Sequence, residues 1–272
     1  MRLHSLSTDR YFVNFRLIVL LFVLSLPTWV PTAYRRSTHA FRPAKCQIEW
    51  PFVAEWETPP LEDPELLSVL QAPFTYLAKG AQSYVFLSEN GQYVLKLFRY
   101  DTCRMPLGRI FATKICHWTG MKPKHFVPAV EKIPFTFNSC LLAYKLAQKQ
   151  TGLAYVHLNP KEGLPILNLV DRLGRKHQID PAHYRFALQH KAEILDGSSE
   201  EVTHSFYQLL NELGEKGLVN TDPKLRRNFG SLNGRVVVID FGNLIYNPDQ
   251  AKEQVALFEK KLHKWKEKHA LL

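Results

Sequence analysis

Short apolar runs separated by turn residues dominate the first half of the folded part of the chain. Residues 74–98 ("FTYLAKGAQSYVFLSENGQYVLKLF") contain three such runs and predict three strands. Gly80 separates the first two runs, and the Asn90-Gly91 pair is typical of a hairpin turn between the last two. Two more strands are predicted in "PILNLVDRLG" and "YRFALQHKA", so the pattern indicates five strands in this region.

Helical periodicity appears in three other segments. Residues 138–150 carry an apolar stripe and are followed by Gly152, a residue typical of helix ends. Residues 199–216 carry a broader apolar face, with a serine at the predicted N-cap and Gly217 at the end. A last amphipathic helix is predicted from Pro248, with lysines on its outer face.

An uncharged run rich in Leu, Val and Phe covers residues 17–33. Its length is close to the lower limit for a membrane-spanning helix, but a signal peptide or a buried helix has the same composition. We expect residues 1–33 to be a single-pass anchor with the folded domain in the cytoplasm, and a cleaved export signal is the alternative. Residues 34–73, rich in Pro and Trp, are interpreted as a linker, and residues 74–272 as the folded domain.

Composition narrows the class of protein without identifying it. The 272 residues are 46% hydrophobic and 22% charged, which is typical of a globular protein with a sizeable core. The formal charge of +10 favours anionic partners such as nucleotide phosphates or an acidic membrane surface. The four cysteines are widely spaced and form no C-x-x-C pair, so we expect buried, reduced thiols and no zinc site.

Three polar segments contain the residue types that a nucleotide triphosphate requires. Lys96 lies in the strand-like "VLKLF", Asp222 and Asn228 lie in "NTDPKLRRN", and Asp240 follows the strand-like "RVVVI". A lysine on a rigid strand can hold phosphates, while carboxylate and amide oxygens are the hard ligands that Mg²⁺ prefers. A second carboxylate can accept or orient the proton of an attacking hydroxyl. We therefore expect a metal to neutralise Asp240 at the end of its buried strand.

The order of a strand lysine, a loop Asp with a downstream Asn, and Asp-Phe-Gly resembles the protein-kinase-like superfamily over residues 74–250. The likeness is to its small, divergent bacterial members. It implies an α+β fold of two lobes, with a five-stranded N-lobe at 74–191, a truncated helical C-lobe at 192–272, and ATP with Mg²⁺ between them. The resemblance further implies nucleotide binding by Gly80, Ser83 and Lys96, catalysis by Asp222 with Lys96, and metal binding by Asn228 and Asp240.

Departures from the family pattern leave two predictions open. The loop at Gly80 has a single glycine, Asn220-Thr221-Asp222 replaces His-Arg-Asp, and the helix at 138–150 contains no acid to pair with Lys96. The first prediction is an ATP- and Mg²⁺-dependent phosphotransferase that acts on a hydroxyl of a protein, sugar or lipid head group. The second is a catalytically inactive kinase-like module for binding or scaffolding at the membrane. Nucleic acid is not an expected partner, because the chain has no stacking or recognition motif.

Overall fold

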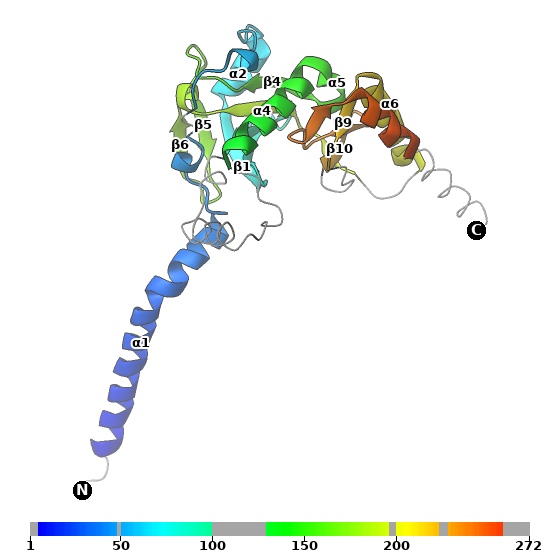
Figure 1. Ribbon diagram of the computed structural model, residues 1–272. Helices are drawn as coiled ribbons and strands as arrows, with labels where there is room; N and C mark the ends of the chain where they lie inside the picture. Colours follow the sequence, from blue (N-terminus) through cyan, green and yellow to red (C-terminus); the bar gives the residue numbers. More distant parts are fainter. Residues whose placement is uncertain (1–4, 48–49, 100–128, 196–199, 223–227, 258–272) are drawn as a thin grey trace, which may run out of the picture.

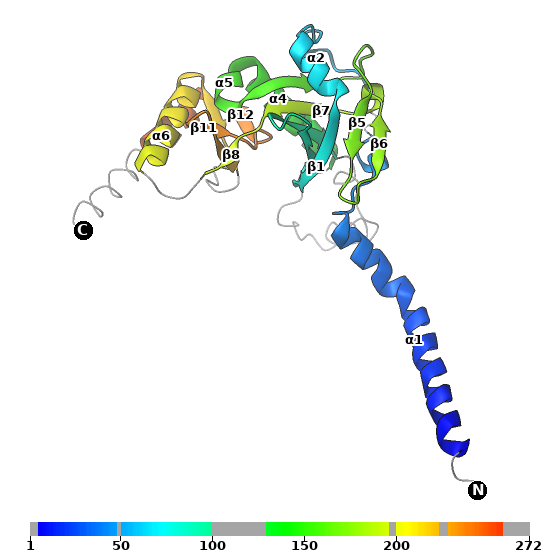
Figure 2. The same cartoon turned by 180° about the vertical axis from the view of Figure 1, so that it is seen from behind.

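The protein is a mixed α+β structure in which one long N-terminal helix projects from a folded domain (Figure 1). The computed structural model describes residues 5–47, 50–99, 129–195, 200–222 and 228–257. The domain contains a seven-stranded mixed sheet, a three-stranded sheet and a two-stranded sheet. Viewed from behind, the large sheet and the two small sheets lie at opposite ends of the domain (Figure 2).

The large sheet has the strand order β4-β7-β3-β2-β1-β5-β6. Its strands are β1 (Pro73–Lys79), β2 (Ser83–Ser88), β3 (Tyr93–Phe98), β4 (Leu153–His157), β5 (Leu167–Val170), β6 (Lys176–Ile179) and β7 (Phe186–His190). The predicted hairpins are confirmed, because β1 pairs antiparallel with β2, and β2 with β3. Gly91 has a φ of 70°, which the tight turn between β2 and β3 requires and which glycine adopts without strain.

The prediction of five strands is wrong, because the sheet has seven. The two missed strands are β4, which pairs with the outer edge of β7, and β6, which pairs with β5. The sequence of β6, "KHQI", has too few apolar residues to indicate a strand, and its neighbour β5 supplies the pairing instead. The hairpin β5–β6 extends the sheet by joining β5 in parallel to β1.

Each face of the large sheet has its own core. On one face, α2 (Pro64–Gln71) covers the α2-face core, whose members include Leu70, Leu95 and the aromatic residues Phe41, Phe74, Tyr84, Phe86, Tyr93, Tyr155 and Phe186. On the other face, α4 (Ala129–Leu146) covers the α4-face core, whose largest members are Trp56, Phe98, Phe137, Leu158, Phe206, Leu209, Phe229 and Phe241. Alternate residues of β3 contribute to the two cores because successive side chains of a strand point to opposite faces.

The predicted linker contributes to the folded domain. It contains the short helical turns η1 (Pro43–Lys45) and η2 (Ala54–Trp56) as well as α2. Asp63 caps α2 by accepting hydrogen bonds from the backbone N–H groups of Glu65 and Leu66, and Leu70 is fully buried. Much of this segment therefore packs against the sheet.

The predicted helix at 138–150 is two helices in the structure. Helix α4 begins earlier than predicted and ends at Leu146, and α5 (Gln148–Thr151) follows after Ala147. Gly152 ends α5 in the left-handed conformation with a φ of 65°, as the sequence predicted. Cys46 and Cys140 are buried free thiols, which confirms the expectation for these two cysteines.

The C-terminal part combines two helices with two small sheets. Helix α6 (Glu200–Glu215) buries its predicted apolar face, including Phe206 and Leu213, and residues 248–257 form the start of the predicted last helix. The strands are β8 (Glu193–Ile194), β9 (Leu218–Asn220), β10 (Phe229–Leu232), β11 (Arg235–Val238) and β12 (Leu244–Tyr246). β11, β10 and β8 form one sheet, and β12 with β9 forms the other. A third short helical turn, η3 (Pro181–His183), precedes β7.

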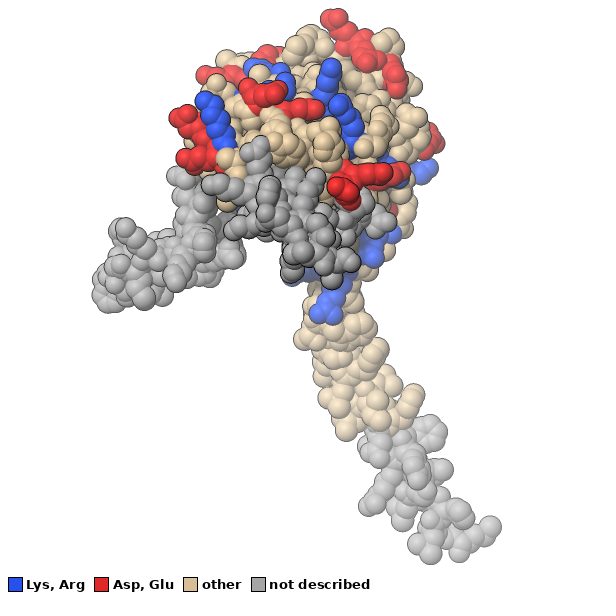
Figure 3. All heavy atoms as spheres, turned by 90° about the vertical axis from the view of Figure 1, so that its right-hand side faces the viewer, with Lys and Arg blue, Asp and Glu red and all other residues tan. Residues whose placement is uncertain are grey.

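Helix α1 (Ser5–Ser37) is long and apolar enough to cross a membrane. The candidate span is Leu17–Ser37, and none of its most apolar window is buried against the domain, so α1 is not a core helix. Arg35 and Arg36 lie in its last turn. Basic atoms gather where the helix meets the domain (Figure 3).

Candidate functional site

Lys96 lies on the side of the large sheet that α4 covers, at the centre of β3. Its Nζ donates a hydrogen bond to the backbone carbonyl of Ile239 and lies 4.5 Å from the centroid of the Phe241 ring. Ile239 and Phe241 flank Asp240, so the strand lysine and the Asp-Phe-Gly segment meet in space although 143 residues separate Lys96 from Ile239. This contact joins the large sheet to the C-terminal part.

The surroundings of Lys96 change the pKa of its ammonium. Burial lowers the pKa of Lys96 from 10.5 to about 8, while the negative charge of Asp240 opposes this shift. The thiol of Cys140, on α4, is close enough to be affected in turn: burial raises the pKa of Cys140, and Lys96 partly offsets the effect. At pH 7 most Lys96 side chains are protonated, and Asp240 is the nearby carboxylate that stabilises this charge.

Helix α4 presents a thiol, Cys140, toward Lys96. The helix is fixed to the chain that follows Asp-Phe-Gly, because the Ser139 hydroxyl donates a hydrogen bond of 2.7 Å to the carbonyl of Leu244. Trp56 adds a second contact from the N-terminal side, where its Nε1 donates to Asn138 Oδ1 at 2.7 Å. The helix therefore links the lysine strand, the linker segment and the Asp240 segment.

Asp222 and Asn228 are held together by the amide of Asn228, whose Nδ2 donates a hydrogen bond to the backbone carbonyl of Asp222. The backbone carbonyl of Asn228 accepts hydrogen bonds from the N–H groups of Ile239 at 2.8 Å and Asp240 at 3.2 Å. On the other side of Asp222, its own N–H donates to Asn220 Oδ1 at 3.0 Å. These bonds bring Asp222, Asn228 and Asp240 into one group.

Asp240 lies outside the buried strand that precedes it. Strand β11 ends at Val238, which is fully buried, Ile239 is half-buried, and Asp240 is exposed. The charge of Asp240 therefore does not require a metal to neutralise it, because water already solvates it. The exposed position still leaves the carboxylate accessible to a ligand.

The loop between β1 and β2 covers the Asp-Phe-Gly turn through Gln82. A Cβ atom added to Gly242 would lie 2.5 Å from Gln82 Oε1 and 3.6 Å from Asp240 Oδ1, so the loop and the turn are in close contact. The loop is closed by the N–H of Gly80, which donates to the carbonyl of Ser83 at 2.8 Å. Gln82 is a residue that the sequence analysis missed, because a single glutamine in a loop has no pattern that indicates this contact.

The structure brings four of the six predicted residues into one network and places the other two beside it. Lys96, Asp222, Asn228 and Asp240 are joined through Ile239 and through one another. Gly80 and Ser83 lie in the covering loop, whose contact with the turn is made by Gln82. No described group contains three or more His, Cys, Asp or Glu side chains arranged to hold a metal.

These residues fit a nucleotide with Mg²⁺, because they combine an ammonium with an exposed carboxylate and an amide. Mg²⁺ is usually bound in proteins by one or two side-chain oxygens and by substrate phosphates, so a cluster of three acids is not needed. The amide of Asn228 uses its Nδ2 for Asp222, which leaves Oδ1 as the atom suited to a metal. Lys96 is suited to a phosphate, because its ammonium lies near Asp240 and could contact a phosphate bound to the same metal.

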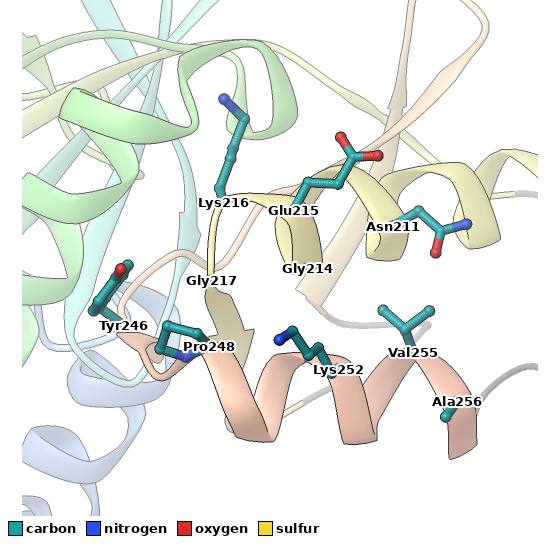
Figure 4. Close-up of a pocket in the computed structure, with 10 residues that line it drawn as sticks. All are labelled: Asn211, Gly214, Glu215, Lys216, Gly217, Tyr246, Pro248, Lys252, Val255 and Ala256. Atoms are coloured by element: carbon teal, nitrogen blue, oxygen red, sulfur yellow. The ribbon is translucent and has the colours of Figure 1, made fainter.

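A separate cavity of about 470 Å³ lies between the end of α6 and the helix of residues 248–257 (Figure 4). Gly214 and Gly217 line it on one side, with Lys252 and Val255 on the other. It contains none of the six predicted residues. Its lysines and its one acid lie on the exposed surface and do not converge, so we assign no chemistry to it.

Comparisons with known proteins identify no family. No protein-family description and no curated protein matches the chain. Among solved structures, the bifunctional kinase-methyltransferase WbdD is similar with a TM-score of 0.35 and 16% identity over 66% of this chain. A complex of WbdD with the kinase inhibitor LY294002 gives a TM-score of 0.37 with 15% identity over 69%.

The chain spans about a third of WbdD, between 34% and 37% of that protein. The Rv3197–erythromycin complex from Mycobacterium tuberculosis is similar over 89% of this chain and 68% of that one, with 14% identity and a TM-score of 0.35. Likeness at this level is too low to assign an activity, a substrate or a family.

Proposed function

We propose that the protein is an ATP- and Mg²⁺-dependent phosphotransferase of kinase-like fold, held at a membrane by α1, that transfers a phosphoryl group to a hydroxyl acceptor. The observation that supports it most is the hydrogen bond from Lys96 to the carbonyl of Ile239, beside Asp240. A strand lysine, an exposed carboxylate and the Asp222–Asn228 loop meet there from three distant parts of the sequence. A lysine that served only to keep the surface soluble would remain in water, whereas Lys96 is desolvated where these three segments meet.

Each residue has a role that follows from its surroundings. Lys96 would hold the phosphates, because its ammonium is fixed on a rigid strand and has one backbone bond that a phosphate oxygen could replace. Asp240 and Asn228 would hold Mg²⁺, which neutralises charge on the phosphates when bound. Asp222 would accept or orient the proton of the acceptor hydroxyl. Gln82 and the loop from Gly80 to Ser83 would cover the phosphates and limit the access of water.

The second candidate is a catalytically inactive kinase-like module that binds a nucleotide or a partner. One contact favours it: α4 faces Lys96 with the thiol of Cys140, and the described side chains of this helix, from Lys132 to Leu146, include no acid. In active protein kinases a glutamate occupies that helix and aligns the lysine for phosphate binding. Here Asp240 is the acid that acts on Lys96, and the same carboxylate would also be required for the metal.

Nucleotide binding is tested with the purified full chain in mild detergent. Thermal unfolding is followed with ATP alone, with Mg²⁺ alone and with both together. At an ATP concentration of about 100 times the dissociation constant, the complex is expected to be stabilised by about 2.7 kcal/mol. Asp240→Ala and Lys96→Met should remove most of this stabilisation, whereas Asp249→Ala and Lys145→Ala, which change exposed residues of the same types, should leave it intact.

Phosphoryl transfer is then measured with γ-labelled ATP and three acceptors in turn: a serine and threonine peptide library, free sugars, and lipid vesicles. Transfer that is lost in Asp222→Asn while ATP binding persists supports the phosphotransferase. Binding without transfer to any acceptor favours the inactive module. If no nucleotide with Mg²⁺ changes the unfolding temperature, the phosphotransferase is wrong, and an inactive module that binds a partner is favoured.

A further inference from the structure

The chain that leaves α1 is attached to the tip of the β5–β6 hairpin through His39. Arg172, at the tip, donates a hydrogen bond of 2.7 Å to His39 Nε2, so this nitrogen is an acceptor. The other ring nitrogen, Nδ1, then carries the proton and donates to the hydroxyl of Tyr76, on β1, at 2.7 Å. Strand β1 and the turn of the β5–β6 hairpin therefore both contact a residue that follows the end of the helix at Ser37.

Several basic side chains surround this attachment. Lys79 and Arg99, at the ends of β1 and β3, lie 5.9 Å and 4.8 Å from the centroid of the Tyr84 ring. The hydroxyl of Tyr84 donates to the carbonyl of Ala40 at 3.0 Å, so both cations lie close to the chain that leaves α1. We call the following set the basic collar: Arg35, Arg36, Lys79, Arg99, Arg172 and Arg175.

The nearby acid, Asp171, is turned into the hairpin. Its carboxylate is 2.9 Å from His177 Nε2 and accepts hydrogen bonds from the N–H groups of Leu173 and Arg175. Burial raises the pKa of Asp171, but these hydrogen bonds outweigh burial and lower it overall. Asp171 is 8% exposed, so its negative charge stabilises the turn and offsets little of the positive charge on the outer surface. Arg172 and Arg175 are exposed on that surface.

An apolar side chain stands at the tip among these cations. Leu173 is 46% exposed and lies between Arg172 and Gly174, with Arg175 following. An exposed leucine flanked by arginines is the combination that inserts into a membrane interface, because the apolar group enters the acyl boundary while the cations contact phosphates.

The collar lies where a bilayer surface would be if α1 crosses the membrane. Residues 17–34, the uncharged part of the candidate span Leu17–Ser37, form a helix about 27 Å long, close to the ~30 Å of a hydrocarbon core, and Arg35 and Arg36 follow at its end. His39 and the hairpin tip that binds it would then lie at head-group depth. Figure 3 shows basic atoms at this junction, while residues 17–34 of the helix carry no charge.

We propose that the basic collar, with Leu173 at its centre, is a binding surface for anionic phospholipid head groups on the side of the membrane where the domain lies. The inference rests on anchoring by α1 and is independent of phosphoryl transfer. Anionic lipids attract basic segments near a membrane, and this attraction weakens within a Debye length. Collar contacts from both α1 and the hairpin would hold the domain in one orientation relative to the bilayer.

The test uses the full chain in lipid nanodiscs and measures hydrogen exchange of the amides in residues 171–176. One set of discs contains phosphatidylcholine alone, and the other contains 30% phosphatidylglycerol. Exchange in this segment is expected to be at least threefold slower in the anionic discs at low salt, and the difference should shrink in 0.5 M salt. The collar variant changes Arg175→Glu together with Lys176→Glu, the exposed lysine beside Arg175 at the start of β6; it keeps the Arg172–His39 bond and should abolish the difference. Lys216→Glu with Lys252→Glu is the matched control, because it reverses two exposed charges in the C-terminal part.

The outcomes separate the collar from its alternatives. Equal exchange in the two kinds of disc, or an unchanged difference in the collar variant, overturns the proposal. A similar slowing in the detergent-solubilised chain with inorganic phosphate shows a small-anion site in place of a bilayer surface, and also overturns it. A chain that does not co-elute with the discs refutes anchoring by α1 and the collar with it, but leaves the nucleotide test unaffected.

Discussion

The α2-face core and the α4-face core lie on opposite faces of one sheet, and both are built from large apolar side chains. The α2-face core is closed by α2 and by residues of the N-terminal segment such as Phe41. The α4-face core also includes residues from the C-terminal part, such as Phe206 and Phe241. Lys96 lies on this second face, beside Phe241. The comparison shows that the α2-face core only stabilises the sheet, whereas the α4-face core stabilises the sheet and also positions the candidate site.

The largest effect is expected from truncating one large buried side chain on each face. Phe137→Ala deletes a side chain that is 2% exposed and contacts the rings of Trp56 and Phe98 at 5.1 and 5.2 Å between centroids. Leu70→Ala deletes a fully buried side chain of the α2-face core. Phe137→Ala should lower the free energy of unfolding by about 3–5 kcal/mol and Leu70→Ala by about 2–5 kcal/mol, measured by chemical denaturation.

Under conditions in which both variants are folded, only Phe137→Ala should also weaken ATP binding. Phe137 lies on α4, the helix that positions Ser139 and Cys140 at the site. Phe135→Ala, on the same helix but 41% exposed, is the control and should change little. Equal loss of ATP binding in Phe137→Ala and Leu70→Ala would contradict the division of tasks between the two faces.

A smaller effect is expected from the buried His157 on β4. Burial is the main cause that lowers the pKa of His157 from 6.5 to about 4, although the hydrogen bond of 2.8 Å to the carbonyl of Pro181 opposes it. Between these two pH values the unfolded chain binds more protons than the folded one. The free energy of unfolding should therefore fall as the pH decreases from 6.5 to 4, by about 3 kcal/mol from this group.

Denaturation of the wild type and of His157→Gln across this pH range measures the contribution. The variant should lose most of the pH dependence that His157 causes, whereas His183→Gln, which changes an exposed histidine, should keep it. A wild-type profile that is flat between pH 6.5 and 4 would show that His157 is not buried in a neutral form.

The smallest expected effect is at the start of α2. Asp63 accepts hydrogen bonds of 2.9 and 3.4 Å from the N–H groups of Glu65 and Leu66, so Asp63→Ala should lower the free energy of unfolding by about 1 kcal/mol. ATP binding should be unchanged, because α2 covers the face of the sheet that is remote from Lys96. Asp63→Asn, which keeps an N-cap acceptor, should restore most of the stability. Weaker ATP binding in Asp63→Ala would show that the two faces are coupled.

The hairpins and the amphipathic helices could be predicted because their signals are local. Asn90-Gly91 sets a turn between neighbouring strands, and the apolar face of residues 199–216 repeats with the period of a helix. β4 and β6 could not be predicted in the same way. They are short, and their positions depend on the exposed edges of β7 and β5, which are formed by residues elsewhere in the chain.

In the candidate site, too, some features follow from local sequence and others depend on residues far apart in the chain. The residue types of Lys96, Asp222, Asn228 and Asp240 were evident from their local surroundings in the sequence. The exposure of Asp240 was not, because whether a residue after a strand is buried depends on what packs against it. The contact between Gln82 and Gly242 depends on two loops that are far apart in the sequence.

By itself, the sequence determined an apolar N-terminal helix, a strand-rich first half and the polar residues that end or interrupt particular strands. Those features depend on neighbouring residues, through turn geometry and the periods of helices and strands. Only the tertiary structure decided which face of the sheet Lys96 occupies and which arginines meet the end of α1. Both depend on pairing between distant strands, and a shift of one residue in the register of β3 would have turned Lys96 to the opposite face.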